Sequence, residues 1–180
     1  MHIVYIHCRP KSSVLKRISK VDLKQVLSVY FVYNILMKTF SVILKELMTE
    51  HSVDAKTLAD VLGLSDSSII YKWIKDEKGL LLPTAVKIAD YFHCSLDYLF
   101  GRSEDYGKDN YNDCPPFDLQ FRKVLDEQKV SQYKLLQDKV ISGGNIDSWL
   151  NRKQTPHIES IIKLANYLNV TMDYLVGRED

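Results

Sequence analysis

The chain has 180 residues, a formal net charge of +1, 46% hydrophobic and 26% charged residues, and few glycines and prolines. This composition is typical of a helix-rich globular protein and argues against a fibrous or low-complexity chain. Its three cysteines, at positions 8, 94 and 114, form no C-x-x-C pair. We therefore expect neither a disulfide framework nor a zinc ribbon, and we expect a reducing, cytoplasmic location.

Residues 1–37 form an N-terminal extension that carries six Lys and Arg against one acid and ends in the apolar run VLSVYFVYNILM. That run is too short to span a bilayer. Three interpretations stay open: an export signal, a buried or membrane-grazing helix, or a segment upstream of a true start at Met37. His2, His7 and Cys8 are too loosely spaced to predict a metal site.

Residues 38–102 and 117–180 carry the same pattern twice. A shift of 76 positions aligns residues 73–102 with the second stretch without a gap, and nine of those thirty positions are identical. They include the closing phrase D-Y-L-x-G-R, and further upstream the shift becomes 77. We interpret this as an internal duplication of about 65 residues, with too few copies for a solenoid. Residues 103–116, SEDYGKDNYNDCPP, are predicted to be a linker.

Each copy is predicted to contain five helices, because its apolar residues recur at helical spacing and no period-two strand pattern competes. Small polar residues mark the expected N-caps of the second, third and last helices: Asp54, Ser65 and Ser95 in the first copy, and Ser131, Ser142 and Thr171 in the second. Gly63, Gly101 and Gly177 mark expected helix ends. The predicted fold class is therefore all-α.

The second and third helices of each copy, joined by a tight turn, predict a helix-turn-helix whose third helix can enter a major groove. Each copy resembles the lambda-repressor-like (Cro-type, also called XRE) helix-turn-helix domain. The matching features are Ile70 and Trp73, repeated as Ile146 and Trp149, and a tail of the form IA-x-YF…S-x-DYL-x-G. The resemblance implies two compact five-helix bundles that bind specific DNA sequences, most often as the transcriptional repressor of a phage or mobile element.

Twelve polar residues are candidate DNA contacts by their position in this pattern. They are Lys56, Ser67, Ser68, Tyr71 and Lys72 in the first copy, and Gln132, Lys134, Asn145, Asp147, Ser148, Arg152 and Lys153 in the second. Lysine and arginine can neutralise phosphates, hydroxyl groups can bond phosphates or base edges, and Asn145 can read adenine bidentately. Gln132 occupies a place where the family often has a Gln that touches the DNA backbone, whereas the first copy has Ala55 there.

The repeated phrase D-Y-L-x-G is interpreted as scaffold that closes each bundle. Asp97 and Asp173 are interpreted as acids that favour a helix N-terminus and lie one domain apart, so they do not predict a pair of catalytic carboxylates. No nucleophile context, pocket motif or metal spacing occurs elsewhere. We therefore expect a protein that is not an enzyme, with no cofactor, no metal and no small-molecule substrate.

Double-stranded DNA is the expected partner, with a second copy of the chain as a further candidate that would make a homodimer. A tethered second module raises the effective concentration at a second half-site. The linker can reach about 45–50 Å when extended, which exceeds the roughly 34 Å between half-sites one helical turn apart. The alternative is a protein-interaction or antitoxin-like regulatory module with weak or no DNA binding in one or both units. Its support is the near-neutral charge of the copies, with eight Lys and Arg against nine acids at 38–102 and nine against nine at 117–180.

Overall fold

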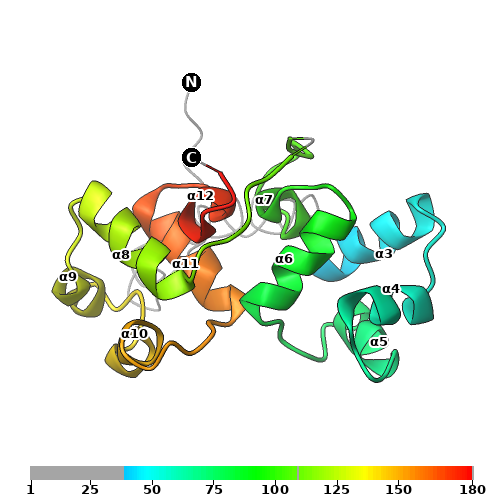
Figure 1. Ribbon diagram of the computed structural model, residues 1–180, viewed down its shortest axis with the longest axis horizontal. Helices are drawn as coiled ribbons and strands as arrows, with labels where there is room; N and C mark the ends of the chain where they lie inside the picture. The colour runs from blue at the N-terminus through cyan, green and yellow to red at the C-terminus, as the bar shows by residue number, and fades with distance from the viewer. Residues whose placement is uncertain (1–38, 109, 180) are drawn as a thin grey trace, which may run out of the picture. The chain divides into compact units, whose positions relative to one another are not determined.

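The computed structural model describes residues 39–108 and 110–179 (Figure 1). These ranges contain ten α-helices and no β-strand, which confirms the all-α class. Every described helix belongs to one compact unit, Thr39–Asp180. The interpretations of residues 1–37 lie outside the described residues. Within the described ranges, no helix combines the length and the apolar content needed to cross a membrane.

The first copy contains five helices with short connections. They are α3 (Phe40–Glu50), α4 (Ala55–Leu62), α5 (Ser68–Ile74), α6 (Leu82–Tyr91) and α7 (Leu96–Leu99). Asp54 caps α4 by accepting a hydrogen bond from the Thr57 amide at 2.7 Å, and Ser95 caps α7 by accepting from the Tyr98 amide at 2.9 Å. Gly63 ends α4 in the left-handed conformation, with φ of 70°. These three predicted boundaries are confirmed.

The second copy repeats this order of helices. They are α8 (Phe117–Glu127), α9 (Gln132–Gln137), α10 (Gly143–Leu150), α11 (Ile158–Leu168) and α12 (Met172–Val176). The side chains of Ser131, Ser142 and Thr171 each accept a hydrogen bond from a backbone amide in the first turn of the helix that follows, as predicted. Gly177 ends α12 with φ of 83°.

The predicted cap at Ser65 is wrong. Helix α5 begins at Ser68, and its first amide donates to the Asp66 carboxylate at 2.8 Å. The cause is the single residue by which the copies differ in length between their second and third helices. With the upstream shift of 77, Ser65 is equivalent to Ser142, which caps α10. The first copy has one more residue between this serine and the buried isoleucine of the helix, so Ser65 lies one position too far from α5 and Asp66 takes over the capping role.

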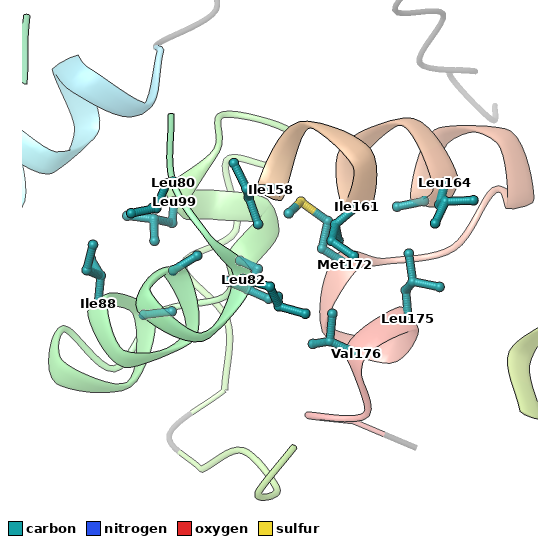
Figure 2. Close-up of a cluster of buried hydrophobic side chains, with 14 of the residues drawn as sticks. Leu80, Leu82, Ile88, Leu99, Ile158, Ile161, Leu164, Met172, Leu175 and Val176 are labelled. Carbon is teal, nitrogen blue, oxygen red and sulfur yellow. The ribbon is translucent and has the colours of Figure 1, made fainter. Parts of the chain in front are cut away.

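The apolar side chains that pack behind α5 and α10 belong to one buried cluster that includes both copies. Figure 2 shows this cluster around α6, α11 and α12, with Leu82 of the first copy and Ile158 and Met172 of the second among its members. Burial of each such side chain contributes roughly 1.5–3 kcal/mol relative to exposure. Because this one cluster contains side chains of both copies, the two copies pack against each other in the 39–180 unit.

The segment between the copies, residues 103–116, contains no helix in its described part and packs against both copies. The Tyr106 carbonyl accepts a hydrogen bond from the Ser95 amide at 2.7 Å in the first copy. The Asn112 amide donates to the Arg178 carbonyl at 2.8 Å in the second. The extended reach of this segment therefore does not set the separation of the copies, contrary to the reasoning from chain length alone.

Candidate nucleic-acid interface

Helices α4 and α5 form the helix-turn-helix of the first copy. Gly63 turns the chain after α4, and the Leu64 amide donates back to the Ala59 carbonyl at 2.9 Å. Ile70 and Trp73 point into the core with 0% and 3% of their surface exposed. Because α5 buries these two positions, the side chains between them face solvent, and α5 is held with one polar face outward.

The candidate residues of the first copy lie in the first turn of α4 and along α5. Lys56, Tyr71 and Lys72 are exposed, and Ser67 and Ser68 at the start of α5 are half-buried. Within the described residues, neither Lys56 nor Lys72 forms an ion pair, so both ammonium groups are available to phosphates.

Asp66 places a negative charge at the start of α5. Its two carboxylate oxygens accept hydrogen bonds from the Ser68 hydroxyl and the Ser68 amide. These bonds lower the pKa of Asp66, so the carboxylate stays ionised at neutral pH. A phosphate is disfavoured beside Asp66, and the Ser68 hydroxyl already donates its proton within the protein.

Helices α9 and α10 form the corresponding pair in the second copy. Ile146 and Trp149 are buried, and Phe117 and Phe121 of α8 pack edge-on against the Trp149 ring at 5.9 and 6.0 Å between centroids. The candidates Gln132 and Asn145 are exposed, at the starts of α9 and α10.

The remaining candidate charges of the second copy lie near carboxylates of the same copy. The Lys134 Nζ is 3.1 Å from the Asp138 Oδ1, and the Arg152 Nε is 3.0 Å from the Asp147 Oδ2. The Asn151 amide also donates to Asp147 and, with Arg152, lowers the pKa of that carboxyl. Asp147 is therefore engaged inside the protein, and the positive charge offered to DNA is partly neutralised.

The other two candidates of this copy are a half-buried serine and a lysine near a carboxylate. Ser148 is half-buried on α10, and the Lys153 Nζ lies 4.0 Å from the Asp118 Oδ2. The twelve candidates thus form two groups, one in each copy. In Figure 1 the helices α5 and α10 lie at opposite ends of the described part, along the same edge of the view.

One interpretation from the sequence is wrong: Asp97 and Asp173 do not lie one domain apart. The Asp97 Oδ2 accepts a hydrogen bond from the Met172 amide at 2.7 Å, and the Asp173 Oδ2 accepts one from the Leu96 amide at 2.8 Å. Both carboxylates lie at the contact between the copies, with 8% and 2% of their surface exposed. The signal that could have indicated this role was the repetition of D-Y-L-x-G-R in both copies, because an interface with two-fold symmetry uses the same residues twice.

Two features of the described residues bear on metal or cofactor binding: the placement of their His, Cys, Asp and Glu side chains, and a cavity between the copies. Across 39–108 and 110–179, no group of three or more His, Cys, Asp or Glu side chains is arranged to hold a metal ion. A cavity of about 560 Å³ lies between the copies, with mostly apolar lining that includes Leu82, Val86, Phe117 and Trp149. Of the candidate DNA contacts, Lys153 alone lines it.

Residues 44–105 match the family model of the Cro/C1-type HTH DNA-binding domain, a range that includes α4 to α7 and most of α3. No curated protein matches the chain, and no solved structure matches it. Residues 44–105 are thus similar to a DNA-binding helix-turn-helix domain, which supports a DNA-binding regulator.

Proposed function

We propose that this protein is a sequence-specific DNA-binding transcriptional regulator, a cytoplasmic repressor of the phage or mobile-element type, with no enzymatic activity. The observation that carries the proposal is the outward face of α5, held on a capped helix-turn-helix inside the segment that matches a DNA-binding family. A helix of this kind fits the major groove, which is about 12 Å wide.

The second copy acts as a second DNA-binding unit in this proposal. Its support is internal: α8 to α12 follow the order of α3 to α7, with Ile146 and Trp149 in the inward positions of Ile70 and Trp73. The cap at Ser142 leaves Asn145 exposed in the first turn of α10. An exposed amide in that place can recognise adenine.

Phosphates and bases are contacted by different residues in this proposal. Lys56 and Lys72 neutralise phosphates, which releases counterions and makes binding salt-dependent. Ser67, Tyr71 and Asn145 face base edges, where hydroxyl and amide groups distinguish base pairs. Because the copies are nearly neutral overall, this attraction depends on a few local cations.

A protein-binding role for the second copy is the alternative that one observation favours. Tyr133 and Leu136 on α9 are 67% and 40% exposed, while Lys134 is paired with Asp138. A helix that exposes apolar side chains and neutralises its own cations suits a protein partner better than a phosphate backbone.

Selection of binding sites from a random duplex library tests the proposal. The full chain at about 50 mM salt should enrich a defined sequence, and its affinity should fall with rising salt. Lys45→Ala on the exposed side of α3 serves as a charge-matched control for Lys72→Ala, and only Lys72→Ala should weaken binding. Absence of any enriched sequence would contradict the regulator and favour the protein-binding alternative.

A further inference from the structure

The contacts between the copies occur in pairs that are related by the 76-residue repeat. The Leu82 amide donates to the Pro156 carbonyl at 3.0 Å, and the Ile158 amide donates to the Leu80 carbonyl at 2.9 Å. Adding 76 to Leu82 gives Ile158, and subtracting 76 from Pro156 gives Leu80, so the second bond is the first with the two copies exchanged. Such reciprocity is the defining property of an isologous interface, in which two units are related by a two-fold axis.

The reciprocal bonds of Asp97 and Asp173 obey the same rule. Leu96 and Met172 are the first residues of α7 and α12, so their amides have no partner inside their own helix. Each amide is satisfied by the carboxylate of the other copy, in a buried position. The N-terminus of the last helix in each copy is therefore completed only when the other copy is in place.

Two arginines complete the paired network. Arg102 forms an ion pair with Asp97 and donates to the Asn166 Oδ1 at 3.1 Å, across the contact. Arg178 forms an ion pair with Asp173 and contacts the Asp90 Oδ1 at 2.7 Å, also across the contact. Asp90 and Asn166 are equivalent positions. Separating the copies would leave buried charged groups without their partners, so this network favours one relative orientation of the copies.

The exposed side chains of α5 and α10 differ between the copies, whereas the Asp and Arg residues that form ion pairs at the contact between the copies are the same in both. The sequence of α5 places Ser68, Tyr71 and Lys72 at the positions where α10 has Gly144, Asp147 and Ser148. Side chains of different hydrogen-bonding type recognise different base edges. If both helices bind DNA, α5 and α10 therefore present different hydrogen-bonding groups to the bases, although a two-fold axis relates them.

We propose that one chain, acting as a covalent pseudo-dimer, binds a DNA site made of two half-sites in inverted orientation, with unequal sequences and a fixed spacing. This inference rests on the proposed DNA-binding function. Inverted orientation follows because a two-fold axis in a protein is mirrored by a two-fold relation between its half-sites. Fixed spacing follows because the network of Asp97, Asp173, Arg102 and Arg178 holds the copies together, whereas a flexible tether would tolerate several spacings.

Changes to the DNA provide a test that needs no altered protein. The full chain is used to select a site, and the spacer of that site is then lengthened by five and by ten base pairs. An insertion of five base pairs moves one half-site to the opposite side of the duplex. An insertion of ten base pairs returns that half-site to its original side but increases the distance between the half-sites by about 34 Å. Both changes should reduce affinity by about 100-fold or more, because the second head loses its half-site.

Symmetrised sites and stoichiometry sharpen the same test. Duplexes with two copies of either half-site should bind more weakly than the natural asymmetric site. Native mass spectrometry should find one chain per duplex. Direct repeats, a single half-site, tolerance of the ten-base-pair insertion, or two chains on one palindrome would each overturn the inference while leaving the regulator intact. A library with no enriched sequence would instead overturn the proposed function.

A variant of the interface adds a protein-side test. The double change Asp97→Ala and Asp173→Ala removes both reciprocal caps, and Glu104→Ala with Asp126→Ala is a control that removes two exposed acids. The interface variant should bind the natural site more weakly, and its preference for the natural spacing should fall at least about tenfold. An unchanged spacing preference in a folded variant contradicts the inference, and the spacer series decides the matter if the variant does not fold.

Discussion

The two copies share their inward side chains and differ in their outward ones. Ile70 and Trp73 reappear as Ile146 and Trp149, and all four are buried. Between them, the exposed Lys72 of the first copy is replaced by the half-buried Ser148 of the second. The comparison teaches that the positions that hold the third helix in place are common to both copies, whereas the surface offered to a partner is particular to each.

Charge separates the copies further. Lys56 and Lys72 of the first copy form no ion pair within the described ranges, whereas Lys134 and Arg152 of the second lie beside carboxylates. We therefore expect the first copy to contribute more of the electrostatic attraction to DNA, and the second to contribute more through Asn145.

The largest expected effect comes from the buried arginine of the interface. Arg178 has no exposed side-chain surface, whereas its equivalent Arg102 keeps 13% exposed. Arg178→Ala should lower the free energy of unfolding by about 3–5 kcal/mol, because Asp173 is left buried without its partner. Arg102→Ala should cost less, since water can reach Asp97. Urea denaturation of both variants measures the difference, and equal losses would show that the two halves of the network are equivalent.

A matched pair of leucines tests whether side-chain packing stabilises the two copies equally. Leu58 and Leu135 are equivalent and fully buried, so Leu58→Ala and Leu135→Ala should each cost about 2–5 kcal/mol. Leu136→Ala, at a position that is 40% exposed, is the control and should cost much less. Chemical denaturation followed by circular dichroism gives the values. A small effect at Leu135 alone would mean that the second copy is the looser of the two.

The pH dependence of stability should reveal the buried carboxylate. Burial raises the pKa of Asp173 to about 6, against the opposing effect of Arg178. A carboxyl with a raised pKa in the folded state favours folding below its unfolded pKa of about 3.8, and this contribution is lost as pH rises towards 6. The change is on the order of 2–3 kcal/mol. Asp173→Asn should flatten the stability profile between pH 4 and about 6, and an unaltered profile would count against this assignment.

The division of roles between phosphate and base contacts predicts different binding defects. Lys72→Ala should weaken binding to all sequences and reduce the salt slope by about one. Asn145→Ala should relax the preference at one base pair, by about 1–3 kcal/mol, and leave the salt slope unchanged. Affinities for a set of mutated sites at several salt concentrations separate these outcomes. The same uniform loss from both variants would contradict the assignment.

The smallest effect concerns the glycines that open α10. No atom lies within 4 Å of a Cβ added at Gly144, and this residue has no positive φ. Gly144→Ala should therefore raise the free energy of unfolding by about 0.5–1 kcal/mol through lower backbone entropy in the unfolded chain. Gly63→Ala is the control of opposite sign, because Gly63 has φ of 70°. Thermal melts compare the two, and destabilisation by Gly144→Ala would indicate that a side chain is not tolerated there.

Local features of this protein could be predicted from its sequence. The caps at Asp54, Ser95 and Ser142 and the inward positions of Ile70 and Trp73 depend on residues within one or two turns, whose spacing is visible in the sequence. The cap at Ser65 was missed because a single extra residue displaced it and a neighbouring carboxylate replaced it.

The arrangement of the copies was decided by the tertiary structure. Asp97 and the Met172 amide are 75 residues apart, and the residues beside each of them in the sequence do not indicate that the Asp97 carboxylate satisfies an amide of the other copy. The sequence by itself determined the helices, most of their starts and the inward face of the third helix in each copy, because these depend on near neighbours. Its tertiary structure alone joins the copies as an isologous pair, because buried amides and carboxylates from distant segments must find partners that only the folded chain provides.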